Sequence, residues 1–273
     1  MPELIIEPGR TERNYWRDLW RYRELFYFLA WRDILVRYKQ TVMGVAWAVV
    51  RPFLTMVIFT IIFSRVAKLQ APAAVPYGLL VMAGMLPWQF ISLSLAASAD
   101  SLVQNSNLVS KIYFPRLIVP ASSVITSFVD FLITIGLMAL MMAWYHYVPD
   151  WRLVGLLPFM LLAVAASIGA GLWLCALNVE YRDFRYIVPF IVQFGLYVSP
   201  VGFSSSVVPG KWRALFSLNP VVGVIDGFRW SLLRGQPLAW WPDLMNSVLV
   251  TAFLYISGIW YFRRMERGFA DII

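Results

Sequence analysis

Long apolar runs separated by short charged segments constrain this chain more than any other feature of its sequence. A helix needs about 20 mostly apolar residues to cross about 30 Å of hydrocarbon. The apolar runs predict membrane spans at residues 44–64, 77–99, 117–145, 153–177, 186–201 and 244–262. We therefore expect an all-α integral membrane protein with six transmembrane helices.

Composition supports the membrane class and argues against a soluble or nucleic-acid-binding protein. Of 273 residues, 60% are hydrophobic and only 14% are charged, and the mean hydropathy is +0.67. A soluble protein of this composition has too little polar material to cover its surface. The formal net charge is +8, but the basic residues gather at the ends of the apolar runs, as membrane orientation requires. No separate basic face is left to bind DNA or RNA.

The same basic residues predict how the chain lies in the membrane. The connections that hold Lys111, Arg116, Arg182 and Arg185, and the arginines after the last run, fall on the side of the basic N-terminal segment. The positive-inside rule makes that side cytoplasmic. We expect both termini on the cytoplasmic face of the cytoplasmic (inner) membrane. Basic residues between 202 and 243 are exceptions, in a segment long enough for the rule to be weak.

Three segments depart from a simple span. Trp16 to Lys39 alternates Arg and Lys with aromatic residues, which predicts an amphipathic helix at the membrane surface. Residues 1–43 are thus a cytoplasmic tail with an interface helix, and residues 44–273 the transmembrane domain. Residues 202–243 are cut by Pro and Gly, which predicts short re-entrant periplasmic helices between the fifth and sixth spans. Residues 100–116 predict a short polar helix, with Asp100 or Ser101 as its N-cap.

Signals of catalysis are almost absent. No His, Cys or carboxylate cluster has metal-ligand spacing, and no Ser, His and Asp set shares a face. The nearest approach to a phosphate-binding loop, VPGKW at Val208–Trp212, lacks the first glycine and has Trp where Ser or Thr binds magnesium. We expect no catalytic residue, metal or cofactor in this chain. Asp130, deep inside a run, fits a proton or cation site or an interhelical hydrogen bond, and the lack of a second acid nearby favours the hydrogen bond.

Four blocks of sequence carry a resemblance to a known family. They are RELFYFLAWRDILVRYKQTVMGVAWAVVRP at 23–52, NLVSKIYFPR at 107–116, LNVEYRDFRYIVPFIVQFGLYVSPVGF at 177–203 and LNPVVGVIDGFRWSLL at 218–233. In this order and at these spacings the chain resembles the transmembrane subunits of polysaccharide-export ABC transporters. That family includes permeases for O-antigen, teichoic acid and capsule, and the resemblance is greatest to the O-antigen permeases.

The resemblance implies the partners and the residues that meet them. Permeases of this family form homodimers and work with two copies of a separate ATPase subunit, which binds the ATP and magnesium. The segment 100–116 resembles the coupling helix that docks in the ATPase, with a smaller second contact in the loop around 180–185. The residues expected at these contacts are Lys111, Phe114, Arg116, Glu180 and Arg182.

The resemblance also implies a substrate and a path for it. The expected function is export of a lipid-linked polysaccharide, with ATP hydrolysed by the partner subunit; another lipid or drug exporter and a non-transporting membrane scaffold remain as alternatives. Aromatic rings can stack on the apolar faces of sugars without holding them tightly. In the family the channel lies between protomers along the first, second and fifth spans. The candidates to line it are Trp47, Phe53, Phe59, Trp88, Phe90, Phe194 and Tyr197.

Overall fold

The computed structural model describes residues 15–39, 42–69, 75–235 and 241–269, which form helices and no β-strand. Five of the helices are long and apolar enough to cross a membrane. The chain is therefore a multi-pass membrane protein. These five helices are α3 (Val42–Thr60) with its continuation η2 (Ile61–Val66), α4 (Tyr77–Gln104), α6 (Ile118–Trp144), η3 (Trp151–Gly155) with α7 (Leu156–Glu180), and α11 (Trp241–Met265).

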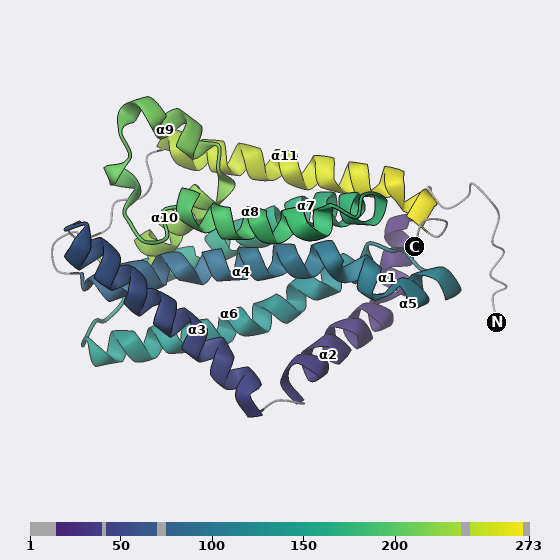
Figure 1. Ribbon diagram of the computed structural model, residues 1–273, viewed down its shortest axis with the longest axis horizontal. Coiled ribbons are helices and arrows are strands. Elements are labelled where there is room, and N and C mark those ends of the chain that lie inside the picture. The colour runs from purple at the N-terminus through teal and green to yellow at the C-terminus, as the bar shows by residue number, and fades with distance from the viewer. Residues whose placement is uncertain (1–14, 40–41, 70–74, 236–240, 270–273) are drawn as a thin grey trace.

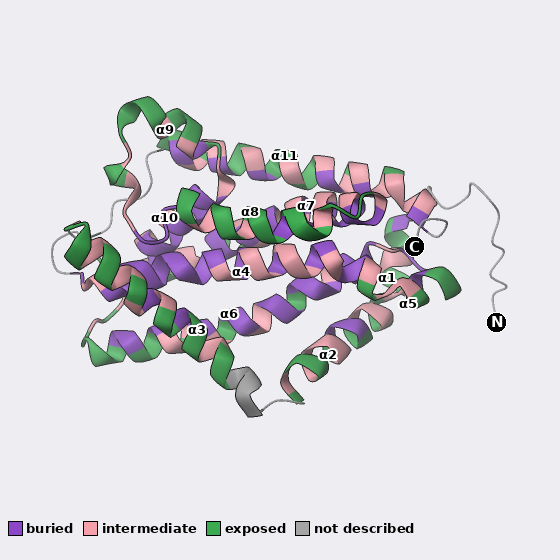
Figure 2. Cartoon of the chain, viewed as in Figure 1, coloured by how far each residue is buried: buried purple, intermediate pink, exposed green. Residues whose placement is uncertain are grey.

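Helix α4 is the centre of the bundle. It contacts α6 and α7 along its length and also touches α3, α8 (Phe184–Val198) and α10 (Pro220–Leu232). In its most apolar stretch 78% of the residues are buried, against 11% in α3 and 17% in α11. Figure 2 shows the same contrast, with α4 mostly buried and α3, α8 and α11 largely exposed. The outer helices thus carry apolar faces that the single chain leaves uncovered.

The segment predicted as the fifth span is shorter in the structure than the five helices above. Helix α8 has 15 residues, about 22 Å of helix, which is less than the ~30 Å of a hydrocarbon core. It runs beside α4 and α7 and is followed by an irregular stretch, η4 (Ser205–Val207) and two short helices, α9 (Gly210–Ser217) and α10. The broken pattern expected at residues 202–243 is present as short helices up to residue 235, residues 236–240 lie outside the described residues, and α11 begins at Trp241.

The predicted interface helix is two helices. α1 (Tyr15–Arg21) and α2 (Arg23–Lys39) meet at Tyr22 and point in different directions in Figure 1. α2 runs beside α6, so part of its length is covered by protein. Several of its aromatic side chains still point outward, among them Tyr27, Phe28 and Trp31.

The N-cap expected at Asp100 or Ser101 is wrong. Helix α4 continues through both residues to Gln104, and the short helix α5 (Ser106–Lys111) begins only after Asn105. The reason is tertiary contact, because Ser101 and Leu102 are buried against neighbouring helices and the helical backbone there is covered by protein. The side-chain amide of Asn105 donates to the backbone carbonyl of Ser101 at 2.8 Å, which caps the last turn of α4.

The bundle has two distinct ends. One holds α1, α5 and the C-terminal turn η5 (Glu266–Gly268), and we refer to it as the α5 end; the opposite one holds α9 and α10 and is the α9 end (Figure 1). Each end has its own group of buried apolar residues. The larger group surrounds the first half of α4, and the smaller joins α1, α2, α5, α7 and α11 at the α5 end.

Candidate functional site

The predicted coupling residues at the end of α5 and in the loop after it differ in how far they are buried. Lys111, the last residue of α5, is exposed. Phe114 is only 4% exposed and packs in the apolar group at the α5 end. Arg116 is half-buried. A protein that docks on this loop can therefore reach Lys111 directly, whereas Phe114 holds the loop against the bundle.

Arg116 connects this loop to the C-terminal turn. Its backbone N–H donates to a carboxylate oxygen of Glu266 at 2.7 Å, and its guanidinium donates to the Glu266 carbonyl. Burial raises the pKa of the Glu266 carboxyl, and this effect outweighs the Arg116 N–H and the guanidinium groups of Arg116 and Arg263, which lower it. Arg263 also lies over the ring of Tyr15, 4.6 Å from the ring centre. The coupling loop, α1 and the end of α11 thus form one polar cluster.

A second connection links α2 to the start of α5. The guanidinium of Arg32 donates to the side-chain oxygen of Asn105 at 2.8 Å, and it also contacts the carboxylate of the adjacent Asp33 at 2.8 Å. Asn105 is the residue between α4 and α5. The residue that precedes α5 is therefore joined to α2 by a direct side-chain contact.

The second predicted contact loop lies at the same end. Glu180 ends α7 and is half-buried, with the hydroxyl of Tyr261 3.5 Å from its carboxylate, while Arg182 is exposed. Two residues earlier, the side-chain amide of Asn178 donates to the Ala99 carbonyl at 2.9 Å and to the Asp100 carboxylate at 3.0 Å. The ends of α4 and α7 are thus joined, and both loops leave the bundle on one side (Figure 1).

Asp130 is paired, which confirms the interpretation that it bonds to a neighbouring helix. The hydroxyl of Tyr38 donates to its Oδ1 atom at 2.5 Å, and the guanidinium of Arg37 lies 2.9 Å from Oδ2. Both partners come from the end of α2. The Asp130 side chain is only 10% exposed, so its carboxylate is largely withdrawn from solvent.

The aromatic residues predicted to line a channel fall into two groups. Trp47 and Phe53 on α3 and Phe194 and Tyr197 on α8 are exposed, with exposed fractions between 43% and 65%. Helices α3 and α8 both touch α4, and α8 presents further exposed rings, since Phe190 stacks on Phe194 at 5.8 Å. These residues are free to meet a second protein, a lipid or a substrate.

The remaining candidates point inward. Phe90 is 1% exposed and lies among Phe128 and Phe131 in the core of the chain, a placement that favours a structural role. Trp88 is 9% exposed because α8 covers it, with a Cβ on Gly195 falling 2.6 Å from its ring. Phe59 is half-buried and its ring contacts Phe63. The channel role of these residues stays a prediction, and Trp88 lies directly beneath the exposed face of α8.

The α9 end is held together by a buried arginine that sequence reasoning did not single out. Arg229 on α10 is 3% exposed and its guanidinium donates to the carbonyls of Leu80, Val201 and Phe203 at 2.8–3.3 Å. Asp226, one turn earlier, accepts from Ser205 at 2.7 Å. The contacts pin α10 and the segment after α8 to the start of α4. A lone Arg inside the apolar block at 218–233 was the signal that could have found it.

No cluster of His, Cys, Asp and Glu that could hold a metal ion occurs within the residues described above. At the α5 end Lys111 and Arg182 are exposed, and Arg116 is bonded to Glu266. The arrangement therefore suits docking and transmission of movement between helices.

Comparisons with known proteins agree with these features. The model of the ABC-2 type transporter family matches residues 24–233. Two proteins of Klebsiella pneumoniae, each named O-antigen export system permease protein RfbA, are 28% and 26% identical to this chain over 244 and 243 residues, which is 89% of this chain and 92% of each relative. A Myxococcus xanthus protein of the same name is 26% identical over 259 residues, 94% of this chain and 98% of the relative.

Proposed function

The chain belongs to the ABC-2 type transporter family, and from this membership we propose that it is the membrane subunit of an O-antigen-type polysaccharide exporter. It moves a lipid-linked polysaccharide from the cytoplasm across the cytoplasmic membrane, and a separate subunit hydrolyses the ATP. The observation that carries the proposal is similarity over nearly the whole length of three proteins named as O-antigen export permeases.

Our topology has six crossings with both termini in the cytoplasm. Helix α8 is the fifth crossing. The chain leaves α7 at the α5 end and begins α11 at the α9 end, so the segment between them must return across the bundle (Figure 1). α9 and α10 then enter the membrane only partly, as re-entrant helices. The basic residues at the α5 end, among them Lys111 and Arg182, support a cytoplasmic position for that end.

The α5 end is the docking surface for the ATPase. Lys111 and Arg182 are exposed there and offer positive charge from two adjacent loops. The contact between Arg32 and Asn105 then carries a displacement of α5 into α2, and the contacts of Arg116 carry it into α11. A docking helix with bonded residues on both sides, Asn105 before it and Arg116 after it, suits transmission of an ATP-driven movement.

A homodimer places the exposed faces of α3 and α8 opposite their copies, with the glycan path between them. The support is the uncovered apolar surface of both helices, which includes Trp47, Phe194 and Tyr197. Cysteine cross-linking tests this arrangement with little background, because the only cysteine, Cys175, is fully buried. A cysteine at Phe194 should form disulfide-linked dimers in membranes, whereas one at outward-facing Leu161 on α7 should not.

The export function is tested by deleting the gene in a strain that makes the glycan. The polymer should accumulate inside the cell, and the intact gene on a plasmid should restore it to the surface. Normal surface glycan in the deletion strain would contradict the proposal. Accumulation of a different lipid or a drug would favour the alternative exporter, and purification of the chain without any ATPase subunit would favour a scaffold.

A further inference from the structure

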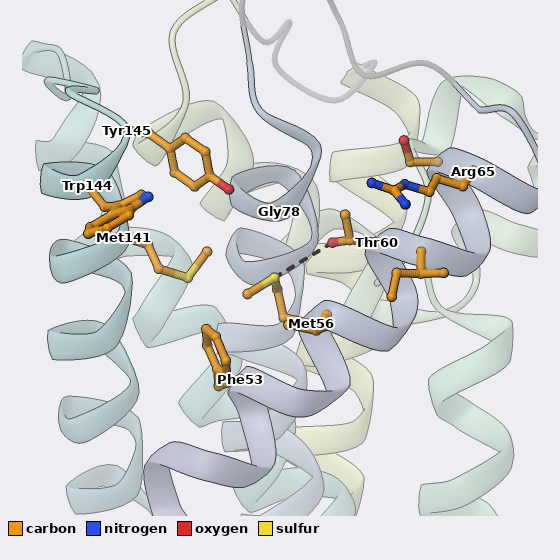
Figure 3. A pocket seen from close by; sticks show the side chains of 11 residues that line it. Phe53, Met56, Thr60, Arg65, Gly78, Met141, Trp144 and Tyr145 are labelled. Atoms are coloured by element: carbon orange, nitrogen blue, oxygen red, sulfur yellow. Dashed lines mark hydrogen bonds between the residues drawn. The ribbon is translucent and has the colours of Figure 1, made fainter.

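A cavity lies between α3 and α6 at the α9 end, and of the aromatic residues predicted to line a channel only Phe53 borders it. It measures about 500 Å³, within the range of about 300–1,000 Å³ that small-molecule sites occupy. Residues of α3, η2, the first turn of α4 and the end of α6 line it (Figure 3). The cavity lies on the side of α3 that faces α6. The exposed rings of α8 lie elsewhere, because α8 packs against α4.

The interior of the cavity is apolar and elongated. Phe53, Met56 and Met141 form much of its lining, and Gly78 leaves its floor open, since a Cβ there would lie 3.3 Å from the Met56 sulfur. The lining continues along one face of α3 from Phe53 to Arg65, 12 residues or about 18 Å of helix. This length is about half of a ~30 Å hydrocarbon core, which suits a chain that reaches inward from one leaflet.

The mouth of the cavity carries a positive charge. Arg65 lies in η2, and Figure 3 shows its guanidinium turned toward the space between Thr60 and Tyr145. In the described part of the chain no acidic side chain is paired with it. A guanidinium at this place is complementary to a phosphate, which it can bind through two parallel hydrogen bonds.

Two further features place the mouth at the level of lipid headgroups. Trp144 and Tyr145, at the end of α6, line the cavity on the side opposite Arg65 (Figure 3), with exposed fractions of 82% and 47%. Trp and Tyr gather where hydrocarbon meets headgroups, and Arg near a helix end extends toward the same level. In addition, η2 is a π-helical turn, a distortion that is frequent at functional sites.

We propose that this cavity binds one anionic glycerophospholipid of the periplasmic leaflet, with its phosphate on Arg65 and an acyl chain along α3. The positive mouth selects an anionic headgroup over a zwitterionic one. The bound chain fills the wedge between α3 and α6, so it fixes the position of a helix that protein contacts leave mostly uncovered. This inference does not depend on which substrate the protein exports.

The test measures lipid binding to the purified full-length protein by native mass spectrometry. Phosphatidylglycerol and phosphatidylcholine with identical acyl chains are added in turn to protein depleted of lipid. We expect phosphatidylglycerol to bind more tightly than phosphatidylcholine. Arg65→Gln should weaken phosphatidylglycerol binding about tenfold, as the loss of one charged contact predicts, while binding of phosphatidylcholine stays unchanged.

Two variants complete the design. Ser64→Trp fills the cavity next to Arg65 and should abolish binding of both lipids. Lys68→Gln removes a nearby exposed cation that does not line the cavity and should leave binding at the wild-type level. Because Arg65 is exposed, its variant is expected to fold, and a thermal unfolding scan checks this.

Three outcomes would overturn the proposal. These are equal binding of the two phospholipids to the wild type, wild-type binding of phosphatidylglycerol by Arg65→Gln, and wild-type binding by folded Ser64→Trp. Tighter binding of undecaprenyl phosphate than of phosphatidylglycerol would also overturn it, because the occupant would then be a glycan carrier lipid.

Discussion

The guanidinium of Arg37 lies 2.9 Å from the carboxylate of Asp130, and this pair attaches the end of α2 to the middle of α6. Asp130 is 12 residues, or about 18 Å, from the start of α6. The end of α2 therefore lies well along α6 instead of at its first turn. Because α3 begins at Val42, soon after Lys39, the pair also sets where the first membrane span starts.

Removal of the acid should loosen this attachment. We expect Asp130→Asn to lower the free energy of unfolding by about 1–3 kcal/mol, since it removes the negative charge 2.9 Å from the Arg37 guanidinium. We expect a loss near the lower end of this range, because the Arg37 side chain is 38% exposed and solvent screens its charge. Thermal unfolding in detergent measures the loss.

The matched control is Asp183→Asn, the same chemical change at an exposed acid whose side chain makes no cap hydrogen bond. It should leave the melting temperature unchanged. Arg37→Gln should destabilise the protein, and the double variant should be no worse than Asp130→Asn alone. Full additivity of the two losses would show that the pair contributes no coupling.

Lengthening the connection between α2 and α3 should uncouple them. The site of insertion, near Gln40, lies outside the described residues, but the anchor at Asp130 and the start of α3 on either side are described. We expect four added Gly and Ser residues to reduce export several-fold while ATPase binding persists, because a flexible linker transmits no displacement. Export at the wild-type level would mean that α2 only anchors the chain.

Charge reversal should have different effects at Lys111 and Arg116, the two basic residues of the predicted coupling segment. Lys111→Glu changes an exposed residue, so we expect it to weaken binding of the ATPase subunit about tenfold, about 1.4 kcal/mol, with no change in thermal stability. Arg116→Glu also removes the guanidinium contact with the Glu266 carbonyl and adds a second carboxylate near Glu266, so it should lower the melting temperature as well. Co-purification of the ATPase and unfolding of the isolated chain distinguish the two effects; equal behaviour of both variants would contradict the structure.

Glu266 should make stability depend on pH. Burial raises the pKa of its carboxyl above the value in the unfolded chain. The folded state therefore binds the proton more readily, and the stabilisation from protonation is complete below the unfolded pKa of about 4.3. It is lost as pH rises through the raised pKa of the folded state.

Glu266→Gln should remove this contribution, so that the variant loses less stability than the wild type as pH rises from 4 toward neutrality. Glu24→Gln, at an exposed acid in the first turn of α2, should leave the wild-type profile unchanged. Unfolding midpoints measured across this range provide the comparison. A Glu266→Gln profile parallel to that of the wild type would remove Glu266 as the source.

The contact between α7 and α11 should tolerate no added side-chain atom. A Cβ on Gly258 would lie 2.3 Å from the carbonyl oxygen of Gly169, and backbone cannot move aside cheaply. We expect Gly258→Ala to destabilise the protein by about 1–3 kcal/mol. Gly136→Ala, where a Cβ meets nothing within 4 Å, should be neutral or stabilising by up to about 1 kcal/mol, as alanine is in an open helix position.

The lengths of the apolar runs were sufficient to predict where most of the long helices lie. The runs predicted at 77–99, 117–145 and 244–262 are α4, α6 and α11 with shifts of a few residues. The error at Asp100 and Ser101 arose because polar residues predict a cap only where the helix end meets water, and here protein covers it. The sequence could not predict which residues pair with Asp130, because that pairing depends on α2 lying along α6.

The sequence by itself determined the membrane class and the positions of most of the long apolar helices. These follow from the length of apolar runs and from the placement of basic residues, which are properties of neighbouring residues in the chain. Only the tertiary structure decided which aromatic residues are exposed, that Arg116 bonds to Glu266, and that a cavity with Arg65 at its mouth lies between α3 and α6. Those outcomes depend on the rotation and separation of helices, and distant segments set these only when they pack together.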